Sequence, residues 1–349
     1  MGSRIDRGRS SQRVERFFRL RLCSRAGQPA NRVGIEPKSE TAMKSRTAGR
    51  MLQPPWLDRA GRFSWLKAAT LALCCLPALK LAAVWIVWGL GPRPLNAATH
   101  ETGDWAVRFI LITLAVTPAR FLFEWPRLIV VRRLLGLTAF AYALIHFSLY
   151  IVDQNFNPLV VVAEIASRIY LTIGFAALAG LAALAATSTD AAIKRLGQRW
   201  NTLHRLVYII AALALIHDFM QTKLDVTTAV FLSGYFAWLM GYRALRHWRF
   251  TIGPPLLLAL AVVAGLATAL FEVGWYSLTT GRQPLRLLAA QFDFSFEYRP
   301  AWWVLAAGIG VLVCSVVWRA IAPGRSGRPS QARGHRRATV PSETPASNG

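Results

Sequence analysis

The sequence is short of acidic residues and of charge in general for a chain of 349 residues. It has 17 Asp and Glu against 41 Lys and Arg, while 54% of its residues are hydrophobic and 17% are charged. A charged fraction this small excludes an ordinary soluble domain of this size and indicates a membrane-embedded chain.

Cysteines are also few, and their spacing excludes several cofactors. The four cysteines, at positions 23, 74, 75 and 314, form no metal-ligand pair and no C-x-x-C-H. A zinc site, an iron–sulfur cluster and covalently attached haem are therefore unsupported. The sequence also has no GxGxxG and no soluble flavin, nicotinamide or molybdopterin domain. We expect the reducing and terminal catalytic sites to lie on other molecules.

The net charge of +24 is uneven along the chain. Residues 1–50 carry 13 basic and four acidic residues, and the tail from Pro323 carries five Arg and one Glu. The remaining excess lies in short segments between apolar runs, which favours membrane topology over nucleic-acid binding. We expect 1–67 to be a disordered basic extension, with Met51 favoured as the true start, and 323–349 to be a disordered basic tail.

Long apolar runs recur through the rest of the chain. They lie at about 68–90, 108–123, 134–152, 169–186, 203–217, 226–241, 253–274 and 302–319. Lengths near twenty residues without period-two alternation select helices over barrel strands. We predict an all-α polytopic membrane bundle of eight spans, give or take one, with a six-helix core over 68–242 and two additional helices over 243–322.

The distribution of Lys and Arg predicts the orientation of these spans. One set of alternate connecting segments carries 19 basic residues: 51–67, 119–133, 187–205, 242–250 and 320–349. The other set carries seven: 91–108, 153–168, 218–225 and 275–300. Because basic loops stay in the cytoplasm, we predict that both termini are cytoplasmic.

Three of the six histidines lie within or at the lip of predicted helices, namely His146, His204 and His217. An ionisable side chain inside a bilayer is a candidate functional residue, although a single His can also simply bond a neighbouring helix. Two neutral imidazoles from facing helices can hold a six-coordinate haem iron, which would be b-type here. The other histidines fall in predicted loops or tails, where we expect them to be solvated: His100, His247 and His335.

Helix geometry predicts how the three histidines pair. The 13 residues from His204 to His217 span about 20 Å at ~1.5 Å per residue, so these two should not share one iron. His146 and His217 both lie toward the periplasmic ends of parallel helices and make the better pair. Arg132 lies level with His204, and Arg132 or Arg133 suits a haem propionate better than iron. His204 and His217 also point about 140° apart on an ideal helix, so either the helix is distorted or His204 occupies an irregular first turn.

Four stretches of this sequence resemble one known family. They are LAVTPAR at 114–120, RRLLGLTAFAYALIH at 132–146, RIYLTIG at 168–174 and ATSTDAAIKRLGQRWNTLHRLVYI at 186–209. They are similar to the MsrQ or YedZ family, the haem-binding membrane subunit of the periplasmic methionine-sulfoxide reductase system. That family belongs to the ferric-reductase-like transmembrane group, and the resemblance covers roughly 68–242.

The resemblance implies a function and a set of site residues. It carries over His146, His204 and His217 as haem ligands, while Arg132 occupies the first ligand position on the third helix, which leaves a second haem open. It implies that electrons pass from the quinone pool or a cytoplasmic flavin reductase to a periplasmic molybdopterin subunit that reduces methionine sulfoxide, at the bacterial inner membrane. FMN is associated with the family, but this sequence has no phosphate-cradling glycine motif to place it.

Two other functions remain as alternatives. A ferric or other metal reductase on the same haem scaffold would differ only in its final acceptor. A carrier that relays protons through His146 and His217 would be expected to show internal repeats or matched broken helices. We find neither in the sequence, beyond Pro77 in the first run and the Gly-Pro-Pro at 253–255. A reduced-minus-oxidised absorption spectrum separates the haem proteins from the carrier.

Overall fold

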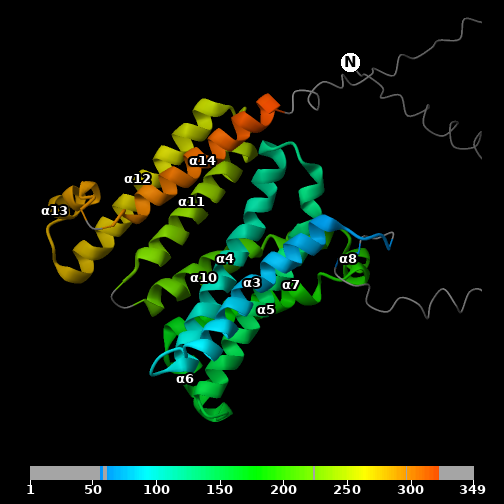
Figure 1. Ribbon diagram of the computed structural model, residues 1–349, viewed down its shortest axis with the longest axis vertical. Helices are drawn as coiled ribbons and strands as arrows, with labels where there is room; N and C mark the ends of the chain where they lie inside the picture. Colours follow the sequence, from blue (N-terminus) through cyan, green and yellow to red (C-terminus); the bar gives the residue numbers. More distant parts are fainter. Residues whose placement is uncertain (1–55, 58–60, 223–224, 296, 322–349) are drawn as a thin grey trace, which may run out of the picture. The chain divides into compact units, whose positions relative to one another are not determined.

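The structure is a computed structural model that describes residues 56–57, 61–222, 225–295 and 297–321 (Figure 1). Among these residues the regular elements are all helices, with one isolated β-bridge between Leu57 and Phe63. The predicted all-α class is confirmed. The helices, in chain order, are α3 (Trp65–Val87), α4 (Pro94–Leu122), η2 (Pro126–Leu128), α5 (Ile129–Asp153), α6 (Pro158–Ser167), α7 (Ile169–Ala186), α8 (Asp190–Leu196), α9 (Gln198–His204), α10 (Val207–Gln221), α11 (Thr227–His247), α12 (Pro254–Thr280), α13 (Pro284–Ala289), η3 (Ala290–Phe292) and α14 (Pro300–Ile321).

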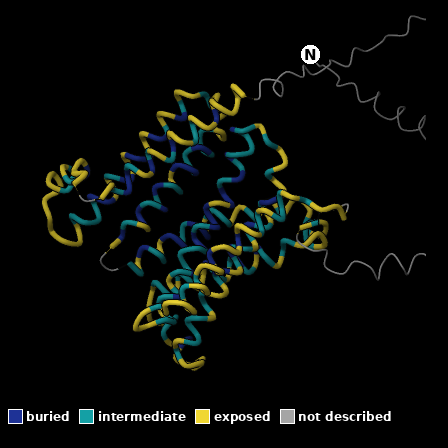
Figure 2. The backbone as a smooth tube through the Cα atoms, viewed as in Figure 1, coloured by how far each residue is buried: buried dark blue, intermediate teal, exposed yellow. Residues whose placement is uncertain are grey.

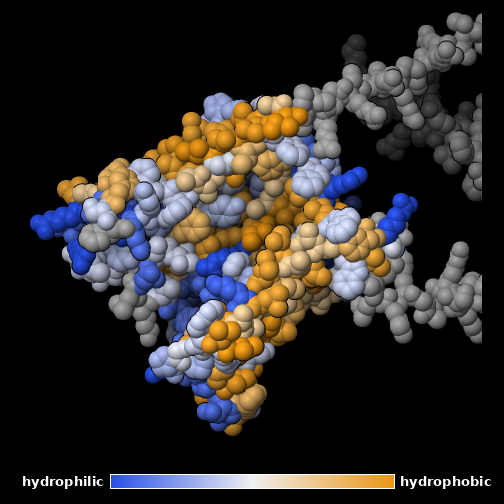
Figure 3. All heavy atoms as spheres, in the orientation of Figure 1, coloured by the Kyte–Doolittle hydropathy of each residue, from blue (hydrophilic) through white to orange (hydrophobic). Residues whose placement is uncertain are grey.

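Among the described residues, seven spans are long and apolar enough to cross a membrane. They are α3, α4, η2 with α5, α7, α9 with α10, α12 and α14. The remaining predicted span, 226–241, forms the 21-residue helix α11, which is less apolar because it carries Arg243 and Arg246. Figure 3 shows broad apolar surface over α3, α12 and α14. The chain is therefore a multi-pass membrane protein.

Two predicted boundaries differ from the structure. Helix α4 begins at Pro94, well before the predicted start at 108. The hydropathy pattern missed this part of the helix because its first turns are polar. The Thr99 hydroxyl donates to the Leu95 carbonyl within these turns, at 2.8 Å, so polarity does not end the helix. His100 consequently lies exposed on α4 and not in a loop. Helix α3 begins at Trp65, so it includes the last residues of the extension predicted over 1–67; most of that extension and the 323–349 tail lie outside the described residues.

Helix α4 lies at the centre of the helical packing. It contacts α3, α5, α10 and α11, and its membrane window is the most buried of the seven spans. Figure 2 shows buried residues concentrated along α4, α10 and α11. Helices α12 and α14 pack on α11 and on each other, with Gly308 so close that a Cβ there would lie 2.5 Å from Ala261 Cβ. Such close approach through small residues is the usual way membrane helices associate.

Two prolines lie inside helices of this core, and a side chain from a neighbouring helix bonds the backbone close to each of them. Pro118 in α4 removes the amide that would bond the Leu114 carbonyl, and Arg243 of α11 donates to that carbonyl instead, at 2.5 Å. Near Pro77 in α3, the Tyr142 hydroxyl of α5 donates to the Cys74 carbonyl at 2.9 Å and accepts from the Ala78 amide at 3.0 Å. Unpaired backbone groups are costly in a bilayer, so these bonds lock α3 to α5 and α4 to α11.

The predicted loop over 153–168 contains a helix that the hydropathy pattern did not predict. Helix α6 is capped by Asn157, whose side-chain oxygen accepts from the Leu159 and Val160 amides, and Pro158 occupies its first turn. Both residue types are typical helix starts. The Tyr150 hydroxyl of α5 donates to Glu164 at 2.6 Å and so fixes α6 to α5.

Candidate functional site

The structure brings His146 and His217 together from two different helices. His146 lies on α5 and His217 on α10, and their ring centroids are 6.1 Å apart with the ring planes at 83°. Both rings line one cavity. Neither imidazole is paired with a carboxylate in any ion pair of the described residues.

Each ring is oriented by a backbone carbonyl on a neighbouring helix. His146 Nδ1 lies 2.7 Å from the Thr99 carbonyl of α4, and His217 Nδ1 lies 2.8 Å from the Tyr170 carbonyl of α7. A carbonyl oxygen only accepts, so in both residues Nδ1 carries the proton and donates it. The Nε2 atoms therefore carry the lone pairs, which is the form that ligates a metal.

Two glycines leave room for the imidazole rings. A Cβ on Gly103 of α4 would lie 2.8 Å from His146 Nδ1, and one on Gly174 of α7 would lie 2.6 Å from His217 Nδ1. Each glycine lies four residues after the carbonyl that orients the same ring, so both groups share one helix face. Any larger residue at these positions would push the imidazole away from its carbonyl.

These two arrangements have the same spacing along the chain. Each Nδ1 bond joins residues that are 47 positions apart. Adding 71 to residue numbers 99, 103 and 146 gives 170, 174 and 217, the carbonyl, glycine and histidine of the second arrangement. The helix pair α4 and α5 thus corresponds to α7 and α10. Three matching positions are too few to identify a repeat in the sequence. The common offset of 71 residues was nevertheless the signal from which both glycines could have been predicted.

The cavity between the histidines has a volume of about 420 Å³, within the range of cofactor sites. Its apolar walls include Phe147 of α5 and Phe175 of α7, whose rings lie 5.9 Å apart. Its charged lining is mostly acidic and consists of Asp104, Asp153, Glu164 and Asp218 with Arg168. The Oδ2 atom of Asp218 is buried and has no hydrogen-bond partner.

His204 is not part of this cavity. It ends the short helix α9, and its ring stacks on Trp200 with centroids 3.9 Å apart. Its Nδ1 lies 3.2 Å from the Trp200 carbonyl and its Nε2 lies 3.4 Å from Ser188 Oγ. Helix α10 begins at Val207, so the helical conformation is interrupted directly after His204. Helix geometry predicted either a distorted helix or an irregular first turn at His204, and this interruption is such a distortion.

Arg132 lies on α5, close enough to His204 to interact with it electrostatically. The structure therefore brings these two predicted residues to one region, apart from the cavity that His146 and His217 line. The 71-residue offset that relates the two histidine arrangements pairs His204 with position 133, not 132. Arg133 bonds Asp190 at 3.0 Å and so links α5 to α8.

Helices α4 to α10, with two inward-facing imidazoles between them, define a ferric-reductase-like transmembrane protein. Residues 102–215 match the family described as "Ferric reductase like transmembrane component". This match includes His146 and ends two residues before His217. No solved structure matches the chain.

Curated relatives specify the family within this class. The chain is 40% identical over 200 residues to the "Protein-methionine-sulfoxide reductase heme-binding subunit MsrQ" of Polaromonas naphthalenivorans, covering 54% of this chain and 90% of the relative. It is 45% identical over 178 residues to the protein of that name from Rhizobium meliloti, covering 47% and 81%. For the Rhodospirillum rubrum protein the identity is 39% over 188 residues, covering 53% and 88%. The chain belongs to the MsrQ family.

Proposed function

We propose that this protein is an electron-transfer subunit in which His146 and His217 hold one b haem. The observation that carries the proposal is the pair of oriented imidazoles, each with Nδ1 bonded to a carbonyl and Nε2 left for a metal. The two rings stand close enough together for one metal ion to be held between them if their Nε2 atoms face it. The separation of their ring centroids is 6.1 Å. The donor set and the spacing therefore fit a bis-histidine haem.

The residues around the pair have separate tasks. His146 and His217 would hold the haem, which would supply one-electron transfer rather than oxygen chemistry. The Thr99 and Tyr170 carbonyls hold the two tautomers, which also makes the imidazoles stronger ligands. Phe147 and Phe175 keep water from the cavity wall, and the glycines let the rings approach the helices. The sequence has no phosphate-cradling glycine motif that would place an FMN.

The relatives of this chain are named haem-binding subunits of a protein-methionine-sulfoxide reductase, a name that implies a separate catalytic subunit. We therefore assign the terminal reaction to a partner, the periplasmic catalytic subunit that reduces methionine sulfoxide in oxidised proteins. The acidic lining of the cavity, with Asp153 and Glu164 near its surface, supports docking of a basic face of that partner. The excess of basic residues in alternate segments supports an orientation in which this end faces the periplasm and both termini face the cytoplasm.

Electrons would enter from the opposite side of the bacterial inner membrane. The quinone pool and a cytoplasmic flavin reductase are the two donors consistent with the family. The region of His204 and Arg132 lies on that side and is the candidate for a second cofactor. This region contains one imidazole, so we propose a single haem. We assign the region of His204 and Arg132 to the entry of electrons from the donor.

Absorption spectroscopy of the purified protein tests the haem assignment. The reduced-minus-oxidised spectrum should show low-spin b haem, and His146→Ala or His217→Ala should abolish it while the protein still inserts into the membrane. His204→Ala is the matched control, since it removes an imidazole that does not line the cavity. Full haem content in both cavity variants would refute the proposed ligands.

One observation favours a metal reductase as a second candidate. The carboxylates that line the cavity outnumber its single Arg, and carboxylates attract cations as well as basic proteins. The reduced protein can be mixed separately with a ferric chelate and with the sulfoxide reductase plus oxidised methionine. Reoxidation by the second mixture is expected; reoxidation by ferric chelate alone would favour the metal reductase.

A further inference from the structure

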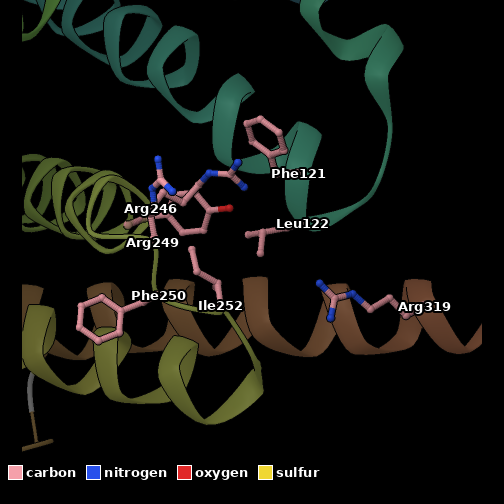
Figure 4. Close-up of a pocket in the computed structure, with 8 residues that line it drawn as sticks. Phe121, Leu122, Arg246, Arg249, Phe250, Ile252 and Arg319 are labelled. Carbon is pink, nitrogen blue, oxygen red and sulfur yellow. The ribbon is translucent and has the colours of Figure 1, made fainter. Parts of the chain in front are cut away.

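A second cavity lies at the opposite ends of the helices from the histidine pair. It has a volume of about 390 Å³ and is lined by Phe121, Leu122, Tyr242, Arg246, Arg249, Phe250, Ile252 and Arg319. Figure 4 shows that these side chains come from the end of α4, the end of α11, the α11–α12 connection and the end of α14. We call it the arginine pocket. None of the residues that line it has a role in the proposed haem site.

The pocket is strongly basic and holds no carboxylate. Three of its eight lining residues are Arg and none is Asp or Glu. No ion pair of the described residues involves Arg246, Arg249 or Arg319. Like charges repel one another, so three arginines that line one cavity without acidic partners indicate a site for an anion.

Arg246 is held in the pocket by aromatic contacts. Its guanidinium lies 3.6 Å from the centroid of the Phe121 ring, and Arg120 lies 4.5 Å from the same ring. It also interacts with the Tyr242 hydroxyl. A guanidinium stacked by its face keeps N–H donors at its edge, and two such donors match two oxygens of a phosphate.

Arg249 occupies a backbone conformation that normally selects glycine. Its φ is 61°, in the left-handed region, directly after the end of α11. The Phe250 amide bonds the Leu245 carbonyl at 3.0 Å and the Arg249 amide bonds the Arg246 carbonyl at 3.1 Å, which is the Schellman pattern of a helix end. A side chain in this conformation is strained, and such strain tends to persist where the side chain is used.

The surroundings of the pocket place it at the level of lipid headgroups. Its floor includes the buried side chains of Leu122 and Tyr242, whereas its three arginines are exposed. Exposed aromatic side chains adjoin it, with Trp248 68% and Phe250 55% exposed. Aromatic residues at helix ends mark the membrane interface, and basic pockets between helices at that level bind anionic lipid headgroups.

We propose that the arginine pocket binds the phosphate of an anionic phospholipid. Arg246, Arg249 and Arg319 would surround the phosphate, and the glycerol and upper acyl chain would lie along the apolar side chains of Phe250 and Ile252. A soluble phosphate offers the same charge but no acyl chain, so the apolar part of the lining favours the lipid. This inference goes beyond the proposed electron-transfer function and does not depend on the identity of the haem ligands.

Native mass spectrometry of the full chain in detergent tests the proposal. The probes are phosphatidylglycerol, phosphatidylcholine and inorganic phosphate, each titrated separately. The wild-type protein should bind one phosphatidylglycerol about ten-fold more tightly than phosphatidylcholine. Arg249→Gly should lose this preference although glycine suits the backbone there, and Arg319→Gln should lose it independently.

Arg286→Gln serves as the control, because it removes an equal charge from an exposed position on α13. It should retain the wild-type preference. Unchanged selectivity for phosphatidylglycerol in both pocket variants would overturn the proposal. Saturable binding of inorganic phosphate that both pocket variants abolish, with no preference between the two lipids, would assign the pocket to a soluble phosphate and would equally overturn it.

Discussion

Substitution of Gly174 by alanine tests the reasoning about the histidine pair without removing a ligand. The new Cβ would lie 2.6 Å from His217 Nδ1 and 2.7 Å from its Cε1. Both separations are shorter than carbon atoms tolerate, so the imidazole must rotate or α7 and α10 must separate. Either movement breaks the 2.8 Å bond from His217 Nδ1 to the Tyr170 carbonyl. We expect Gly174→Ala to weaken haem binding while His217 itself remains.

The magnitude follows from the bond that is lost. Loss of a buried hydrogen bond costs about 1–3 kcal/mol. Loss of the partner that orients a ligand typically lowers metal affinity by about 10–100-fold, which corresponds to roughly the same energy. Titration of the haem-free protein with haem, followed by absorbance, measures the change. Gly103→Ala should behave alike, since its Cβ would lie 2.8 Å from His146 Nδ1.

Two other glycines provide matched controls. A Cβ on Gly136, on the same helix as His146, would meet Thr113 Cγ2 at an ordinary 3.8 Å, and one on Gly274 of α12 would meet nothing within 4 Å. Alanine at these positions should leave haem affinity unchanged and slightly stabilise the helices. The reasoning is wrong if Gly174→Ala binds haem as tightly as Gly136→Ala does.

Three further predictions concern packing, topology and partner. Tyr142→Phe should lower stability by about 1–3 kcal/mol, because the Cys74 carbonyl and the Ala78 amide lose their partner; thermal unfolding in detergent measures this, and an unchanged midpoint would contradict it. Reporter fusions after Gly349 and within 153–168 should report cytoplasm and periplasm respectively, and the reverse pattern would invert the proposed electron flow. Haem reduced by a cytoplasmic electron source should reoxidise when the periplasmic sulfoxide reductase and oxidised methionine are added; haem that stays reduced would count against this partner.

Hydropathy was enough to predict the helices, but not where they begin. All eight predicted runs lie on helices of the structure. The early start of α4 escaped detection because its first turns carry His100, Glu101 and Asp104, and apolar content cannot distinguish a polar helical turn from a loop. Helix α6 was missed for a different reason. Its signal is the Asn157-Pro158 start, which is local chemistry that a long hydropathy window averages away.

Helix geometry likewise predicts only part of the candidate site. The helical rise predicted that His204 and His217 are too far apart to share a metal, and the parallel direction of the two helices predicted that His146 lies level with His217. The groups that orient the rings could not be predicted, because they are backbone carbonyls of α4 and α7 and carry no sequence identity. The angle between His204 and His217 predicted a distorted helix or an irregular first turn, but no proline or glycine marks the position of the break after His204.

The use of main-chain acceptors has a consequence for how this site can vary. No change of the Thr99 or Tyr170 side chain removes the backbone carbonyl that orients each imidazole. A point substitution at 99 or 170 therefore leaves the acceptor of each hydrogen bond in place. The vulnerable positions lie one turn further along, where the glycines stand. Sequence drift at 99 and 170 should therefore leave these two hydrogen bonds in place, while drift at 103 and 174 should not. In the sequence, the orientation of the two ligands therefore depends on two positions where a side chain must be absent.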